Sequence, residues 1–169
     1  MILVTVGTHE QPFDRLVEAA AALGGDEHLI VQYGTSKVAP GRGEWVDFMS
    51  FDELAEHARR ARVVVSHAGV GSIVVARRYG HRPIIMPRRP HFGEHVDEHQ
   101  MQLTRRLAQA GIVTVVEDAG QLAAAVQAPP AVPAADAGAG ALNGPSALSA
   151  DVREVLIGLG AARISARAA

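Results

Sequence analysis

Residues 63–73 read VVVSHAGVGSI, an uncharged β-branched run that leads into a loop of small residues. Such a run is typical of a strand buried on both faces, and such a loop is typical of the start of a helix. Gly69 and Gly71 have no Cβ to hold a ligand away from the backbone, and a helix starting at Ser72 would offer unpaired N–H groups at the positive end of its dipole. The stretch predicts a site for a phosphate or diphosphate; an ordinary strand-to-helix turn is the alternative.

The composition limits the class of protein. The chain has 169 residues, of which 48% are hydrophobic and 20% charged, enough for one globular domain with a core but too few for two α/β domains. A net charge of -2 and dispersed arginines give no basic surface for nucleic acid. Cysteine is absent, which excludes disulfides, thiolate zinc sites and cysteine nucleophiles and fits a reducing cytosol.

No stretch of the sequence predicts a secretion signal or a membrane span. Residues 2–6 predict a strand and lack the basic leader and long apolar core of a signal peptide. Residues 119–150 are nearly free of charge, but prolines and glycines interrupt them, so they cannot cross a bilayer as a helix. We expect a cytoplasmic protein that reaches the inner face of a membrane through a partner or a surface patch.

Strand and helix patterns alternate along the chain. Strands are expected at residues 2–6, 28–33, 44–49, 63–65, 83–86 and 112–116, and helices at 13–23, 51–58, 72–79, 97–110 and 121–127. Ser50 and Glu53 have the spacing of a capping box, and Asp97 with Gln100 predicts a second helix start. This alternation predicts an α/β fold, an open parallel sheet with helices on both faces.

A change of composition predicts the domain boundaries. Residues 1–127 are expected to form the folded domain, and residues 128–148 are an Ala/Pro/Gly-rich linker with almost no large apolar side chain. Residues 149–169 predict a C-terminal helix and a tail. Ser149 would cap that helix, and Val152, Val155, Leu156 and Leu159 form its apolar stripe.

The polar, glycine-bearing loops are expected to meet at one edge of the sheet. They are residues 7–11, 32–35, 66–72 and 87–100, which should all emerge at the carboxyl ends of the strands, where open parallel sheets bind ligands. His99 and Gln100 would face a sugar or a base. Backbone and hydroxyl donors to a diphosphate would come from Gly7, Thr8, Gly69, Gly71 and Ser72.

Other site chemistries compete with this interpretation. Residues 95–99 read HVDEH, the H-x-x-E-H pattern of inverted zinc peptidases, in which His95 and His99 would bind zinc and Glu98 would be the general base. Pro90 and Gly93 interrupt the helix that such a site needs, and Asp97 fits a helix cap instead. The chain has no G-x-S-x-G elbow, and its first strand is not followed by G-x-G-x-x-G. A histidine directly after a buried strand, such as residue 67, is more often held by backbone groups than catalytic.

Three stretches together resemble a known family. They are VTVGTHEQPF at residues 4–13, SHAGVGSI at residues 66–73, and PR at 87–88 followed by FGEHVDEHQ at 92–100. In this order they resemble the C-terminal half of family 28 glycosyltransferases, and most of all its single-domain branch, which includes the Alg13-like subunits and the bacterial PssE and EpsF types of exopolysaccharide synthesis. The resemblance covers residues 1–127.

The resemblance implies one Rossmann-like half of a GT-B fold that binds a nucleotide sugar, typically a UDP-sugar, without a metal or other cofactor. Val75 stands where members related to the peptidoglycan enzyme MurG place a glutamate that holds the ribose. By position, the resemblance assigns donor contacts to Gly7, Thr8, Gln32, Gly34, Ser66, His67, Ala68, Gly69, Gly71, Ser72, Arg88, His99 and Gln100.

The resemblance also implies a partner. A GT-B enzyme needs two such domains, so the acceptor half would be a separate, Alg14-like and membrane-associated subunit, and the reaction would transfer a hexosyl unit to a lipid-linked or polysaccharide acceptor. The general base would lie on that partner, with His9 as a weaker local candidate. Alone, the chain is expected to expose an apolar patch and to self-associate through it. A non-catalytic nucleotide-sugar-binding or regulatory module is the alternative function.

Overall fold

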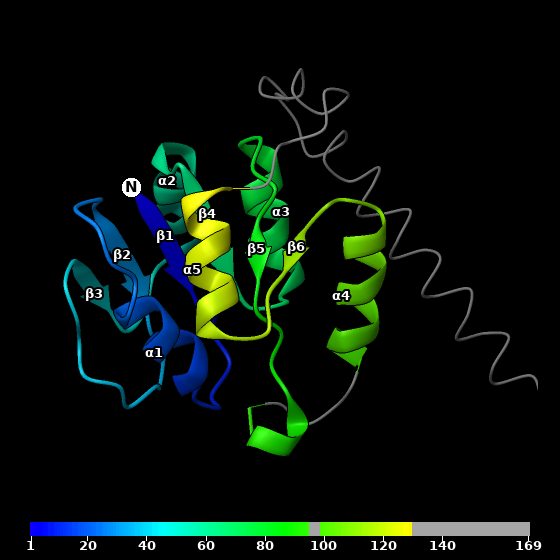
Figure 1. Cartoon of the computed structure of the whole chain (residues 1–169), viewed down its shortest axis with the longest axis horizontal. Helices are drawn as coiled ribbons and strands as arrows, with labels where there is room; N and C mark the ends of the chain where they lie inside the picture. Colours follow the sequence, from blue (N-terminus) through cyan, green and yellow to red (C-terminus); the bar gives the residue numbers. More distant parts are fainter. Residues whose placement is uncertain (95–98, 130–169) are drawn as a thin grey trace, which may run out of the picture.

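The computed structural model describes residues 1–94 and 99–129. These residues form a six-stranded sheet, in the order β3-β2-β1-β4-β5-β6, in which every pair of neighbouring strands is parallel (Figure 1). The predicted open parallel sheet is therefore confirmed. The strands are β1 (Ile2–Thr5), β2 (Leu29–Gln32), β3 (Glu44–Val46), β4 (Val63–Ser66), β5 (Ile84–Ile85) and β6 (Thr114–Val115).

Helices cover both faces of the sheet. On one face, alternate strand residues such as Val4, Val31 and Val65 pack with α1 (Asp14–Ala21) and α5 (Ala119–Gln127). On the other face, strand residues such as Leu3 and Ile85 pack with α2 (Phe51–Arg60), α3 (Val70–Arg78) and α4 (His99–Gln109). Successive side chains of a strand point to opposite faces, so one apolar run supplies both cores.

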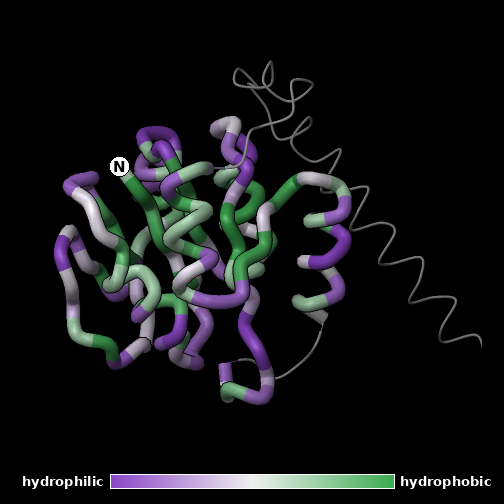
Figure 2. The backbone as a smooth tube through the Cα atoms, in the orientation of Figure 1, coloured by the Kyte–Doolittle hydropathy of each residue, from purple (hydrophilic) through white to green (hydrophobic). Residues whose placement is uncertain are grey.

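The central strands are buried along their whole length. All four residues of β1, of β2 and of β4 are buried, and Val4 lies opposite Val31 on one side and Val65 on the other. Figure 2 shows largely hydrophobic strands between hydrophilic turns at the two ends of the sheet. Burying a valine fully is worth roughly 1.5–3 kcal/mol, which explains why these positions carry no charge.

The capping box predicted for α2 is present. The Oγ of Ser50 accepts a hydrogen bond from the backbone N–H of Glu53 at 3.3 Å, and the Oε2 of Glu53 accepts one from the backbone N–H of Ser50 at 2.8 Å. Two backbone donors that the first turn would leave unpaired are thereby satisfied. Local sequence thus fixes where α2 begins.

Other boundaries differ from the predictions. The helix expected from Ser72 begins at Val70, with Gly69 as an extended N-cap residue, so Gly71 and Ser72 belong to its first turn. The helix expected from residue 121 begins at Ala119, because the Oδ1 of Asp118 caps it by accepting from the N–H of residue 121 at 2.8 Å. The first helix ends at residue 21, before the glycine pair expected to end it.

Several predictions fall on parts of the chain that the structure does not describe. They are residues 95–98 of the HVDEH segment, the linker at 128–148 apart from 128 and 129, and the final helix and tail at 149–169. Within the described ranges, no helix is both long enough and apolar enough to span a bilayer.

Candidate functional site

The candidate site lies where the order of the strands reverses. From β1 the chain proceeds outward through β2 and β3, and it then returns to the other side of β1 for β4, β5 and β6. Parallel sheets bind ligands in the crevice at the carboxyl ends of the two strands that flank such a switch. A cavity of about 310 Å³ opens there, at the lower edge of the sheet in Figure 1, within the usual size range for small-molecule sites. Its walls are formed by Thr5, Gly7, Thr8, Gln32, Met49, Phe51, Leu54, His67, Gly69, Gly71 and Ser72.

One wall of the cavity is the first turn of α3. The N-cap residue Gly69 has no side chain to cap the helix, and the first turn contains no acidic residue. The Oγ of Ser72 donates to the carbonyl of Gly69 at 3.0 Å and accepts from the Oγ of Ser66 at 2.7 Å. In α2 and α5, by contrast, a serine or aspartate side chain caps the first turn. The positive end of the α3 dipole therefore faces the cavity without a protein anion, as anion sites at helix N-termini require.

A second wall is the turn after β1, which Gln32 holds in place. The Nε2 of Gln32 donates to the carbonyl of Gly7 at 2.8 Å, and its Oε1 accepts from the N–H of Gly7 at 3.2 Å. The hydroxyl of Thr5 donates to the same Oε1. Gln32 is 3% exposed, and Gly7 has a φ of 76°, which disfavours other residues. Gln32 therefore holds both the N–H and the carbonyl of Gly7 in place, in addition to lining the cavity.

His67 lies between two of the glycines. A Cβ added to Gly7 would stand 2.2 Å from the Cε1 of His67, and a Cβ added to Gly69 would stand 2.2 Å from its Nε2. These glycines therefore make room for the imidazole, a role that the sequence analysis did not foresee. Gly71 differs, because a Cβ there would meet nothing within 4 Å. Of the residues that line the cavity, His67 alone has an ionisable side chain.

The third wall is apolar, and the sequence analysis missed it. Met49, Phe51 and Leu54 come from the segment between β3 and the second turn of α2, and Phe51 is 63% exposed. A flat apolar surface suits a planar ring. A sequence signal for this wall exists: Phe48 and Phe51 stand on either side of the capping serine, where the first turn of a surface helix is normally polar.

Some predicted site residues lie behind the cavity instead of lining it. Ser66 is fully buried and acts through its bond to Ser72. Ala68 is 1% exposed and packs in the core with Ile73. Gly34 has a φ of 60° and donates its N–H to the carbonyl of Asp47, so it shapes a turn. These residues support the site without facing it.

Arg88, expected to contact the ligand, is instead a buried structural residue. It is 1% exposed, and its guanidinium lies 4.6 Å from the centroid of the Phe13 ring. Its Nη1 and Nη2 donate to four backbone carbonyls, at 2.9 to 3.1 Å. Burial lowers the pKa of Arg88 to about 10, against the opposing effect of Glu94. A guanidinium with these bonds is not available to a ligand in the cavity.

The remaining predicted residues are placed only in part. The Nδ1 of His9 accepts from the N–H of Gln11 at 3.2 Å, and His9 is not among the residues that line the cavity. His99 and Gln100 occupy the first turn of α4, and the described part of the structure does not include their side chains. Within residues 1–94 and 99–129, no group of three or more His, Asp or Glu side chains is placed to hold a metal ion. The HVDEH zinc hypothesis depends on residues outside those ranges.

A second cavity, of about 550 Å³, lies between α4 and the outer strand β6. Arg89 and Glu117, which form an ion pair, are two of its lining residues. Its other lining residues are Pro87, Pro90, His91, Met101, Gln102, Thr104, Arg105, Ala108, Gln109 and Val115.

Comparison with known proteins places this geometry in a family. A family model described as the glycosyltransferase family 28 C-terminal domain matches residues 1–131. The chain belongs to this family. The matched region contains every strand and helix described above.

One curated relative and one solved structure are similar to this chain. The UDP-N-acetylglucosamine transferase subunit ALG13 of Yarrowia lipolytica is 30% identical over 122 residues, which are 63% of this chain and 60% of that protein. The chain thus spans less than two thirds of that relative's length. The crystal structure of CalG4, the calicheamicin glycosyltransferase, matches 91% of this chain and 39% of that one, with a TM-score of 0.58 and 17% identity. This second match is one of fold, and it confirms the prediction of one Rossmann-like half of a GT-B fold.

Proposed function

We propose that this chain is the donor-binding subunit of a two-chain glycosyltransferase that transfers a hexosyl unit from a UDP-sugar. Membership of family 28 supports a transferase. The name of the Yarrowia relative, a UDP-N-acetylglucosamine transferase subunit, supports both the UDP-sugar and the need for a second subunit. The acceptor is a lipid-linked or polysaccharide chain, as in exopolysaccharide synthesis.

The observation that carries this proposal is the uncapped first turn of α3 beside the cavity. In the proposed complex, the N–H groups of Val70, Gly71 and Ser72 bind the diphosphate, with His67 beside it. As the sugar–phosphate bond breaks, negative charge grows on the leaving diphosphate, and donors already held in place stabilise that charge without reorganising. We propose that this arrangement works without a metal cofactor.

The apolar wall gives the nucleotide its orientation. In the proposed complex the base packs on Met49, Phe51 and Leu54, which line the cavity together with the glycine loop. The sugar then points toward the loop between β5 and α4, where His99 and Gln100 begin the helix. This orientation places the reacting carbon at the carboxyl edge of the sheet, open to a second subunit.

The acceptor and its general base come from a partner in this proposal. Among the described residues that line the cavity none is a carboxylate and only His67 is ionisable, and in the proposed complex His67 lies beside the diphosphate. Phe48, Phe51 and Phe92 are 63%, 63% and 58% exposed, and all three lie on segments at the carboxyl edge. We propose that an Alg14-like, membrane-associated subunit covers this edge and brings the cytoplasmic chain to the membrane, and that the isolated chain self-associates there instead.

The test is a binding screen followed by a transfer assay. In thermal unfolding of the full chain, UDP and UDP-sugars should raise Tm more than their GDP and TDP counterparts, as the proposed UDP-sugar donor requires. Mixed with the acceptor subunit, the chain should release UDP in the presence of acceptor, with and without EDTA. Absence of any stabilisation by nucleotides would refute the proposed function.

A second candidate is a binding module that holds a nucleotide sugar without turnover, because none of the described residues that line the cavity is a carboxylate able to act as general base. The transfer assay separates the two candidates, because a complex that binds UDP-sugar and never releases UDP is a module. The zinc alternative predicts bound metal in elemental analysis of the purified chain and loss of activity with EDTA.

A further inference from the structure

Two serines connect the central strand β4 to the first turn of α3. Ser66 is the last residue of β4 and is fully buried, whereas Ser72 is 8% exposed and lines the cavity. The Oγ of Ser66 donates to the Oγ of Ser72 at 2.7 Å, and the Oγ of Ser72 donates to the carbonyl of Gly69 at 3.0 Å. A chain of hydrogen bonds therefore runs from the core of the sheet to the edge of the cavity.

The direction of these hydrogen bonds follows from the chemistry of the groups. A carbonyl oxygen can only accept, so the single hydroxyl proton of Ser72 points to Gly69, and Ser66 must be the donor in the bond between the two hydroxyls. A second contact of the Ser66 Oγ, to the Nδ1 of His67, is longer, at 3.4 Å. The proton of Ser66 is therefore committed to the oxygen of Ser72.

The sheet holds Ser66 in place on both sides. Ser66 pairs with Thr5 of β1 and with Ile85 of β5, and its carbonyl accepts from the N–H of Met86 at 3.0 Å. A donor on a central strand has little freedom to move, and a group on such an element orients its partner more precisely than a group on a loop does. Ser66 therefore fixes the position of the Ser72 oxygen.

The carbonyl of Gly69 does not depend on the hydroxyl of Ser72. It also accepts from the N–H of Ile73 at 3.2 Å, which is the first helical hydrogen bond of α3. When the hydroxyl of Ser72 turns toward a ligand, this carbonyl keeps a partner, and the oxygen of Ser72 keeps the hydrogen bond from Ser66. The rotation therefore leaves no buried polar group unpaired, so the usual cost of breaking a buried hydrogen bond is avoided.

We propose that Ser66 is a positioning residue that orients the hydroxyl of Ser72 toward the diphosphate of the bound donor. This inference rests on the proposed function, which places the diphosphate at the first turn of α3. In the complex, the hydroxyl of Ser72 turns away from the carbonyl of Gly69 and donates to a phosphate oxygen, while Ser66 continues to donate to the Ser72 oxygen. Hydrogen bonds in a chain polarise one another, so Ser66 also makes this hydroxyl a stronger donor.

The test compares ligands with and without phosphate across variants of the full chain. Calorimetry measures the Kd of UDP, and competition against UDP measures the Kd of uridine. Ser72→Ala removes a hydrogen bond to a charged oxygen and should weaken the binding of UDP by about tenfold. Ser66→Ala leaves that hydroxyl in place without its orienting bond and should weaken the binding of UDP by about fivefold. Neither variant should change the Kd of uridine by more than about twofold, because uridine has no phosphate.

The double variant identifies the route by which Ser66 acts. If Ser66 acts through Ser72, replacing Ser66 by alanine should change the Kd of UDP by less than about twofold once Ser72 is already alanine. A full effect of Ser66→Ala in that background would mean that Ser66 acts through another neighbour, such as the Nδ1 of His67, and would overturn the proposal.

Ser66→Cys separates the hydrogen bond from the space that the side chain fills. A thiol is a weak donor, so this variant should bind UDP as weakly as Ser66→Ala does. If Ser66→Cys binds UDP like the wild type, packing at this position supports the site and the hydroxyl has no positioning role.

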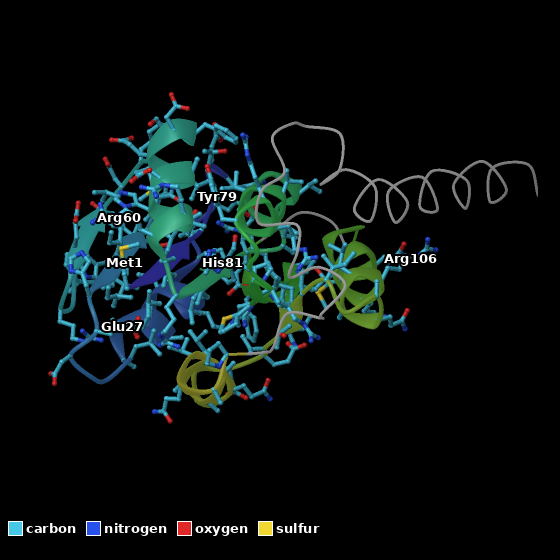
Figure 3. The ribbon with its side chains drawn as sticks, turned by 90° about the horizontal axis from the view of Figure 1, so that it is seen from above. Met1, Glu27, Arg60, Tyr79, His81 and Arg106 are labelled. Atoms are coloured by element: carbon cyan, nitrogen blue, oxygen red, sulfur yellow. The ribbon has the colours of Figure 1, made fainter. Side chains whose placement is uncertain are left out.

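Two control variants separate positioning from general stability. Ser36 is 7% exposed and does not line the cavity, and its Oγ accepts from the N–H of Phe13 at 2.9 Å, so Ser36→Ala also removes a buried serine hydrogen bond. At the far end of α3, on the edge onto which Figure 3 looks, the Nε2 of His81 donates to the carbonyl of Ala58 at 2.7 Å. Ser36→Ala and His81→Ala should each lower Tm without changing the Kd of UDP. Thermal unfolding of every variant confirms that it is folded at the assay temperature.

The outcomes distinguish this inference from the proposed function. If the wild type binds UDP and either Ser66→Ala or Ser72→Ala binds it equally well, the positioning role is wrong and the proposed function stands. The same conclusion follows if Ser66→Ala weakens the binding of UDP and of uridine by the same factor. If the wild type binds neither ligand, the proposed function fails, and this inference fails with it.

Discussion

Replacing Gly71 by alanine should make the free protein more stable and the nucleotide complex weaker. Gly71 is the second residue of α3 after the N-cap, and a Cβ there would meet no atom within 4 Å. Alanine in a helix is favoured over glycine by about 0.5–1 kcal/mol. In a domain of this size, that gain raises Tm by roughly 1–4 °C. The variant carries no steric cost that would hide this gain.

The same methyl group should interfere with the ligand. Gly71 lines the cavity, and a phosphate bound to the first turn of α3 brings its oxygens to about 3 Å from the backbone nitrogens. Carbon atoms normally stay about 3.5–4.0 Å from their neighbours, so the added Cβ lengthens those bonds. Loss of one hydrogen bond to a charged group costs about 1.5–3 kcal/mol, which is about a 10- to 100-fold weaker Kd.

Thermal unfolding with and without UDP tests both effects at once. With UDP at about 100 times its Kd for the wild type, the wild type gains about 2.7 kcal/mol, and a variant that binds 100-fold more weakly gains about 0.4 kcal/mol. The order of the two Tm values should therefore reverse on adding UDP. Gly69→Ala is a less useful variant, because its Cβ would stand 2.2 Å from the Nε2 of His67 and move the ring.

Gly120 provides the matched control. It is the second residue of α5 after the N-cap Asp118, it does not line the cavity, and its Cβ would stand 3.3 Å from the Oδ1 of Asp118. Gly120→Ala should change stability modestly and leave the Kd for UDP unchanged. A Gly71→Ala variant that binds UDP as tightly as the wild type would refute the close approach of backbone and diphosphate on which the proposed function depends.

Three further predictions concern single side chains. Gln32→Met removes both hydrogen bonds to Gly7 and leaves buried polar groups unpaired. It should lower the free energy of unfolding by about 1–3 kcal/mol in urea titrations, and it should also weaken the binding of UDP. Ser50→Ala removes the cap of α2 and should cost about 1 kcal/mol in the same assay. Hydrogen bonds from Arg62 and the N-terminal ammonium lower the pKa of Glu27 from 4.5 to about 2. Its stabilisation is therefore present above pH 4.5 and lost as the pH falls toward 2, and Glu27→Gln should flatten the dependence of Tm on pH in that window.

Local signals predicted most of the fold. Apolar runs identified β1, β2 and β4, and the spacing of Ser50 and Glu53 identified the start of α2, because these features depend on neighbours in the sequence. The helix α3 begins at Val70, two residues before the start predicted from the sequence. A glycine N-cap forms no side-chain bond that a pattern search can recognise, so only the backbone geometry reveals it.

The candidate site was predicted only in part, because the direction in which a side chain points is not contained in local sequence patterns. The glycine loop and Gln32 line the cavity as expected, whereas Arg88, which follows a buried strand and looks available in the sequence, points into the core and bonds to carbonyls. The apolar wall of Met49, Phe51 and Leu54 was missed because it belongs to a segment that no phosphate-binding pattern includes.

By itself, the sequence determined the α/β class and the parallel sheet, and it predicted an anion site at residues 66–72, since each follows from residue types at fixed spacings. Only the tertiary structure decided whether a residue after a strand points into the core or into the cavity. It therefore showed that Arg88 donates to loop carbonyls and that Arg15 and Glu94 form an ion pair. Arg15 and Glu94 are 79 positions apart in the sequence, whereas Arg88 and Glu94 are 6 apart. The contact across 79 positions depends on the packing of whole helices on the sheet, which no local pattern contains.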